Sequence, residues 1–111
     1  MIETSDQELI LLYVPLPDQK TGQMLAQRLL EKNLIACANI FPPHISVYSW
    51  NGAVCDDPEV LTIFKTSSEK KQAAMAAIKE LHPFETPCIT VLKGQDTFAP
   101  YMDWVNRQTN K

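Results

Sequence analysis

The sequence predicts an α+β domain in which four strands and two main helices follow the order β-α-β-β-α-β, with a further helix at the C-terminus. Two observations predict this class. Apolar runs of strand length alternate with two segments of helical periodicity, and an Asn-Gly pair joins the second and third strands as a hairpin. At 111 residues the chain has the size of one domain, so we expect a single domain over residues 1–111, with residues 1–7 flexible.

The first half of the chain contains a strand, a helix and a divided strand. Glu8–Val14 is a continuous apolar run with β-branched and aromatic members, which is typical of a strand buried on both faces. Asp18 can cap a helix that the apolar spacing places at Gln19–Lys32. From Ile35 to Gly52 the chain is extended, but Pro42-Pro43 removes two backbone donors and divides this strand in two.

The third strand continues from the hairpin turn. Asn51-Gly52 indicates a tight turn, after which strand-forming residues run from Ala53 to Lys65. Asp56-Asp57-Pro58 lies inside this run and predicts an irregular interruption of the strand.

The second helix, the fourth strand and the last helix follow. Thr66-Ser67-Ser68-Glu69 has the spacing of a capping box, and the helical pattern after it ends at His82-Pro83. Cys88–Lys93 predicts the fourth strand, and residues 101–105 a short helix. Right-handed crossovers would then place both main helices on one face of a four-stranded antiparallel sheet, the ferredoxin-like arrangement.

The predicted sheet carries more apolar surface than two helices can cover. Residues 60–64 are mostly apolar on both faces of the third strand, and Tyr48 and Trp50 extend an apolar stripe into the hairpin. Large exposed apolar patches usually mark an interface. We therefore expect the chain to self-associate through the open face of the sheet and the hairpin.

Charge and composition exclude several classes of partner. The net charge of -3 provides no positive field for a phosphate backbone, and residues 60–65 lack the aromatic motif of RNA-recognition modules, so we expect no nucleic-acid partner. The apolar run that begins at Leu9 is too short for a membrane span or a signal-peptide core, which favours a cytoplasmic location. Three widely spaced cysteines, an odd number, favour free thiols.

Catalytic motifs are missing from the sequence. It contains no HExxH, P-loop or CxxC pattern and no recognisable nucleophile with its base. An acylphosphatase on the same fold would need a glycine-rich loop and an arginine after the first strand, where this chain has Pro15-Leu16-Pro17-Asp18. We therefore expect a binding protein and not an enzyme.

Several short motifs stand in a fixed order along the chain. They are Cys37-Ala38-Asn39-Ile40, Tyr48-Ser49-Trp50-Asn51-Gly52, Glu59, Lys65-Thr66, His82-Pro83-Phe84-Glu85-Thr86-Pro87 and Tyr101-Met102-Asp103-Trp104. This ordered set, over about Pro17 to Val105, resembles the CutA family. The resemblance implies a ferredoxin-like fold similar to PII signalling proteins, a homotrimer held by sheet extension, and a link to tolerance of copper and other divalent cations.

The chain departs from the family pattern near its histidine motif. Phe84 replaces a tyrosine, and Cys88 replaces a glutamate. The copper ligands proposed for the bacterial branch include a cysteine and a second histidine, where this chain has Val14 and Leu81. Of that ligand set only His82 remains.

His82, Cys88 and Cys37 are the candidate metal ligands, because imidazole and thiolate suit copper and zinc. The candidate cofactor is copper or another divalent cation, and none is required for folding. The alternative is structural: His82 ends a helix, and buried cysteines often act as small hydrophobic residues. No basic residue adjacent to Cys37 in the sequence would activate its thiol.

A second candidate site is a ligand pocket at the subunit interface. Glu59 and Lys65 lie six residues apart in one strand and point to the same face, with Trp50 and Tyr48 from the hairpin as its walls. The alternative is that these residues only stabilise the trimer. The predicted function is a trimeric protein of divalent metal ion tolerance, with copper as the expected ion, that binds or senses and does not catalyse. The alternative is a PII-like signalling or scaffold trimer that binds a small ligand at the interface without metal.

Overall fold

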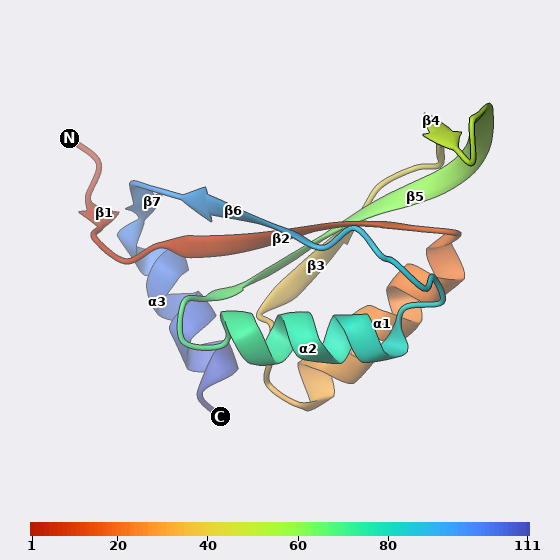
Figure 1. Cartoon of the computed structure of the whole chain (residues 1–111). Helices are drawn as coiled ribbons and strands as arrows, with labels where there is room; N and C mark the ends of the chain where they lie inside the picture. Colours follow the sequence, from red (N-terminus) through yellow and green to blue (C-terminus); the bar gives the residue numbers. More distant parts are fainter.

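The computed structural model describes all 111 residues, which form seven strands and three helices (Figure 1). In chain order these are β1 (Thr4–Ser5), β2 (Leu9–Leu16), α1 (Gln19–Glu31), β3 (Cys37–Ile40), β4 (His44–Trp50), β5 (Ala53–Ser67), α2 (Lys71–Leu81), β6 (Thr90–Gly94), β7 (Thr97–Phe98) and α3 (Ala99–Thr109). The predicted α+β class is confirmed.

The main sheet has the strand order β3-β5-β2-β6, and every neighbouring pair is antiparallel. Leu12 of β2 faces Phe64 on one side and Val91 on the other, which sets the register of the central strands. β4 pairs with the first half of β5, outside this four-strand path. β5 is therefore the strand that joins the sheet to the hairpin.

Helix α1 begins where the sequence predicted. The Asp18 carboxylate accepts hydrogen bonds from the backbone N–H of Thr21 at 2.8 Å and from its hydroxyl at 2.7 Å. Such a cap satisfies one of the backbone donors that the first turn leaves free. The helix ends at Glu31, and Asn33 then adopts a φ of 58° that reverses the chain toward β3.

The core lies between the sheet and helices α1 and α2. The inward side chains of β2 are fully buried and pack with residues of both helices and of β5: Ile10, Leu12, Val14, Leu16, Leu25, Leu29, Phe64 and Ile78. On the opposite face of β2, burial changes along the strand. Leu9 and Leu11 pack under Met102 and Val105 of α3, whereas Tyr13 is exposed. Helix α3 therefore covers only one end of the second sheet face.

The β4–β5 hairpin projects from the body of the protein (Figure 1). Asn51 and Gly52 have φ values of 49° and 78°, as a type I′ turn requires. The radius of gyration is 15.1 Å, against about 13 Å for a compact domain of this length. The predicted division of the second strand is confirmed by the gap between β3 and β4 at residues 41–43.

The predicted interruption of the third strand at residues 56–58 is wrong, because β5 runs unbroken from Ala53 to Ser67. The first half of β5 pairs only with β4, so its other edge is free. Counting from the turn, Pro58 falls at a position whose backbone nitrogen points to that free edge. The missing N–H of Pro58 therefore removes no hydrogen bond between β4 and β5.

The predicted capping box is also wrong. Helix α2 begins at Lys71 without a side-chain cap, and the Thr66 hydroxyl donates instead to the Leu34 carbonyl at 2.7 Å. The fourth strand begins at Thr90, two residues later than predicted. Within the expected flexible segment 1–7, Thr4 and Ser5 pair with Phe98 and Thr97 as a two-residue strand.

A test of the contact between α1 and the sheet is Gly22→Ala. A Cβ at Gly22 would lie 2.9 Å from Thr62 Oγ1, which is buried without a hydrogen-bond partner. We expect the substitution to lower the free energy of unfolding by about 1–3 kcal/mol through overpacking, measured by urea denaturation at fixed protein concentration. The double variant with Thr62→Ala should recover part of this loss, and purely additive effects would contradict the contact.

Candidate functional site

His82 follows helix α2 and turns its ring toward β2. Its side chain is buried, its Nδ1 accepts a hydrogen bond from the Phe84 backbone N–H at 3.1 Å, and its Nε2 lies 3.2 Å from the Pro15 carbonyl oxygen. Because a backbone N–H can only donate, Nδ1 is the acceptor and Nε2 carries the hydrogen that is donated to Pro15. Burial lowers the pKa of His82 below its ordinary value of 6.5 and favours this neutral ring.

Both ring nitrogens of His82 are therefore engaged by the backbone, and neither has a lone pair free for a metal. Cys88 is exposed, and its Sγ lies 3.6 Å from the Thr90 hydroxyl. No group of three or more His, Cys, Asp or Glu side chains is placed to hold an ion. Within one chain the structure does not bring His82, Cys88 and Cys37 together, and the metal site built from them stays a prediction.

Cys37 lies in a cluster that ties α3 to the sheet. Cys37 faces Lys65 on the neighbouring strand, its Sγ lies 3.5 Å from the Tyr101 hydroxyl, and Lys65 Nζ lies 5.7 Å from the Tyr101 ring centroid. Burial, with the Cys37 contact as a second cause, raises the pKa of Tyr101 to about 12. Sequence reasoning missed this cation because it looked for basic residues adjacent in the chain, whereas strand pairing brings Lys65 to Cys37.

The four residues of the predicted ligand pocket do not line one cavity within a chain. Tyr48 donates a hydrogen bond to Asp57 within the hairpin, and this bond raises the pKa of Tyr48 to about 12. Lys65 lies beside α3, whereas Glu59 lies six residues earlier in β5, a separation of about 20 Å. A pocket that combines them needs a second copy of the chain and stays a prediction.

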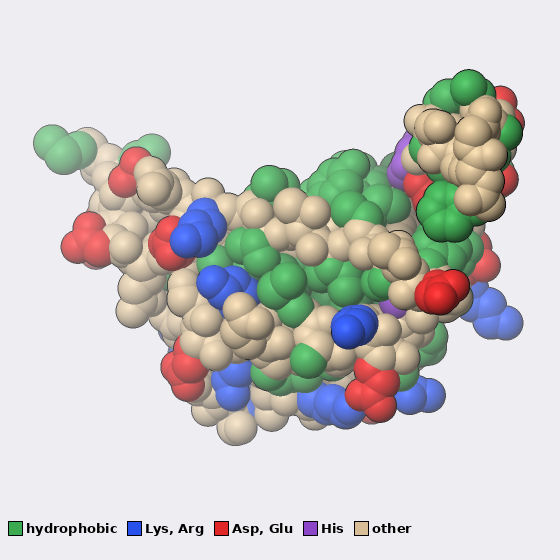
Figure 2. Space-filling model, in the orientation of Figure 1, with side chains coloured by type: hydrophobic (Ala, Val, Ile, Leu, Met, Phe, Trp, Pro, Cys, Tyr) green, Lys and Arg blue, Asp and Glu red, His purple; other side chains and the backbone are tan.

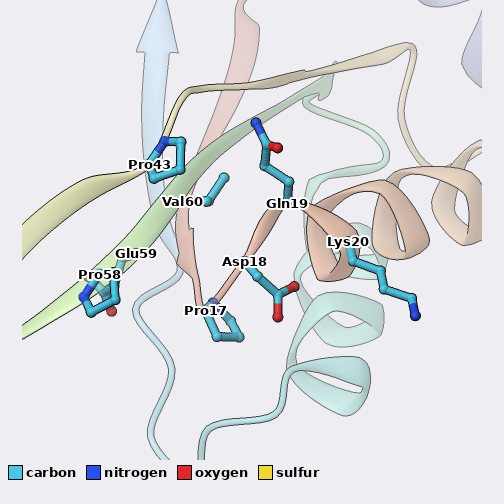
Figure 3. Close-up of a pocket in the computed structure, with 8 residues that line it drawn as sticks. All are labelled: Pro17, Asp18, Gln19, Lys20, Pro43, Pro58, Glu59 and Val60. Atoms are coloured by element: carbon cyan, nitrogen blue, oxygen red, sulfur yellow. The ribbon is translucent and has the colours of Figure 1, made fainter.

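Sequence reasoning missed a pair at the base of the hairpin. His44 and Glu59 stand directly opposite each other on β4 and β5, with Nε2 and Oε1 4.0 Å apart. Glu59 also borders an open depression of about 390 Å³ between this strand junction and the start of α1 (Figure 3). Its lining residues are Pro17, Asp18, Gln19, Lys20, Pro43, Pro58, Glu59 and Val60. The cross-strand register could not be read before the hairpin was known to be regular.

Apolar side chains gather on the sheet and the hairpin (Figure 2). On the hairpin the exposed fractions are 64% for Ile45, 68% for Val47, 61% for Trp50 and 82% for Val54. Because directly opposed strand residues share a face, Ile45, Val47 and Val54 lie on one face of the ribbon and Trp50 on the other. The hairpin is thus apolar on both faces.

Comparisons with known proteins agree on one family. The family model described as CutA1 divalent ion tolerance protein matches residues 10–108. A divalent-cation tolerance protein CutA from Thermotoga maritima is 39% identical over 97 residues, which cover 87% of this chain and 95% of that protein. The structure of divalent ion tolerance protein CutA1 from Ehrlichia chaffeensis matches with a TM-score of 0.91 at 34% identity, covering 96% of this chain and all of that one (100%).

A further structural relative bears on location. The periplasmic divalent cation tolerance protein CutA from Archaeoglobus fulgidus matches with a TM-score of 0.88 at 32% identity, covering 92% of this chain and 99% of that one. In the present chain, none of the three helices has the length and apolarity needed to cross a bilayer.

The neutral state of His82 predicts a pH dependence of stability. The native pKa lies below 6.5, so below that pH the unfolded chain binds more protons than the native one. Stability should be constant above pH 7 and fall as the pH decreases from 6.5 toward the native pKa, as measured by denaturant midpoints at fixed protein concentration. His82→Asn should be less stable at pH 7.5 by about 1–3 kcal/mol and should lose this slope. Equal slopes in the wild type and His82→Asn would contradict the assignment.

Proposed function

The chain belongs to the CutA1 divalent ion tolerance protein family, and from that premise we propose that it acts as a homotrimeric binding protein in the response to divalent metal ions, without a catalytic step. The resemblance inferred from the ordered sequence motifs is thereby confirmed. The family supports a role in metal tolerance. The trimer, the ferredoxin-like, PII-like topology and the preference for copper are the finer parts of this proposal.

One observation carries the assembly: large apolar side chains are exposed on the open sheet face, at Tyr13 and Leu92, and on both faces of the hairpin. A two-stranded hairpin is at best marginally stable alone in water, and this one exposes large apolar side chains on each face. The edge of β5 opposite β4, over residues 53–59, has no strand beside it. A neighbouring subunit can add a strand to such an edge.

A trimer of this kind supports binding or sensing through surfaces shared between subunits. Tyr48 and Trp50 on the hairpin of one copy would then lie against the sheet of another, where the predicted interfacial pocket with Glu59 and Lys65 could form. The engaged nitrogens of His82 favour the second candidate, a PII-like signalling or scaffold trimer that binds a small ligand without metal. Metal titration of the assembled protein separates the two.

We also propose a cytoplasmic location. The chain has no helix suited to span a membrane, and its three cysteines are free thiols, as is usual in a reducing compartment. The relative from Archaeoglobus fulgidus is described as periplasmic, so fractionation of cells that express the tagged chain is the direct test.

Light scattering coupled to size exclusion tests the assembly. We expect a mass of three times the 12.6-kDa chain. Val47→Glu places a charge on the apolar hairpin face and should shift the protein to smaller species, because an unpaired charge is costly to bury. The control is Gln72→Glu, which adds the same charge at an exposed position of α2 and should leave the mass unchanged. A wild-type monomer, or a Val47→Glu trimer, would contradict the proposed interface.

A further inference from the structure

We infer that His44 and Glu59 form a binding site for one divalent transition-metal ion at the base of the β4–β5 hairpin. The inference rests on the metal association of the proposed function and gives it a location different from the ligands that the sequence suggested. His44 and Glu59 are thus proposed as the metal ligands in place of His82 and the cysteines.

The backbone holds the two side chains together. His44 is the first residue of β4, and Glu59 is its partner on β5. Immediately afterwards, at Val60, β5 begins to pair with β2 of the main sheet. The pair is thus fixed at the junction of two ladders, and directly opposed residues have Cβ atoms about 5 Å apart.

The distance between the donor atoms suits an ion. The 4.0 Å between His44 Nε2 and Glu59 Oε1 is too long for a hydrogen bond, so Oε1 is free to bind an ion, as is Nε2 in the tautomer that carries the ring proton on Nδ1. Two donors on one tetrahedral Zn²⁺, each at about 2.0–2.2 Å, lie about 3.3–3.6 Å apart, so the two atoms must approach by less than an ångström. A small rotation of either side chain would bring both atoms to bonding distance of one ion.

His44 is the imidazole that remains available. The chain has two histidines, and both nitrogens of His82 are engaged by the backbone. Within one chain, neither His44 nor Glu59 has a second ion-pair partner. The Glu59 side chain is only 16% exposed, and a carboxylate so far removed from water usually pairs with a cation or coordinates a metal.

The surroundings leave room for the rest of the coordination shell. The depression of about 390 Å³ bordered by Glu59 can admit the waters that would complete it. In Figure 3 the Lys20 side chain points away from Glu59, and the Asp18 carboxylate is held by Thr21. Two protein donors and water make an exchangeable site, and imidazole with carboxylate suits Zn²⁺, Ni²⁺ or Cu²⁺ better than Mg²⁺ or Ca²⁺.

Isothermal titration with Zn²⁺ tests the site. The full chain, stripped with a chelator and titrated at pH 7.5, should bind one Zn²⁺ per chain. His44→Gln and Glu59→Gln should each weaken binding by at least about tenfold. The matched control is Asp56→Asn, which removes the same charge from an exposed position on β5 three residues away and should bind as the wild type does. All variants should keep the wild-type mass in light scattering, which separates lost ligands from lost assembly.

Spectroscopy identifies the ligands independently. Zn²⁺ should shift the ring resonances of His44 and leave those of His82 in place. Bound Co²⁺ should give no thiolate-to-metal charge-transfer band, because neither Cys37 nor Cys88 takes part. These signatures do not depend on the variants being fully stable.

The outcomes distinguish the inference from the function on which it rests. Zn²⁺ binding that survives His44→Gln and Glu59→Gln but is lost in Cys88→Ser would overturn the site and leave metal binding intact. A wild-type trimer that binds no Zn²⁺ would overturn both the site and the metal part of the proposed function, in favour of the scaffold alternative. Binding that follows His44 and Glu59 alone supports the site.

Discussion

The backbone ladder of the 15-residue strand β5 is the interaction on which the rest of the structure depends. β5 pairs with β2, β3 and β4, so it carries the hydrogen bonds of the sheet centre and of the hairpin. Because side chains alternate along a strand, one register assigns Phe64 to the core, Lys65 to the Tyr101 cluster and Glu59 to His44. A slip of one residue would exchange all of these positions.

The unequal cover of the two sheet faces supports the self-association proposed above. Helices α1 and α2 bury the whole inner face of β2, while α3 reaches only as far as Leu11 on the other face. Beyond that point Tyr13 and the hairpin present apolar side chains to water. In the proposed trimer a second copy of the chain would cover these side chains.

The two histidines show how surroundings divide one residue type into two roles. His82 is buried against Pro15 and Phe84, so its ring is neutral and joins the loop after α2 to β2. His44 stands at a strand junction near an open depression, with a carboxylate at 4.0 Å and no hydrogen bond between them. His82 belongs to one of the sequence motifs that resemble the family. His44, whose ring nitrogens make no hydrogen bond to the backbone, lies outside those motifs.

The sequence by itself determined the features that depend on residues close together in the chain. These include the Asp18 cap, the Asn51-Gly52 turn, the break before β4 and the order of the main strands and helices, but not the short strands β1 and β7, because caps and turns form within a few residues. Only the tertiary structure decided which distant residues meet. Thr66 donates to Leu34 instead of capping a helix, and Pro58 fits a free edge. Lys65 faces Cys37, and His44 faces Glu59, because strand register follows from packing over the whole sheet.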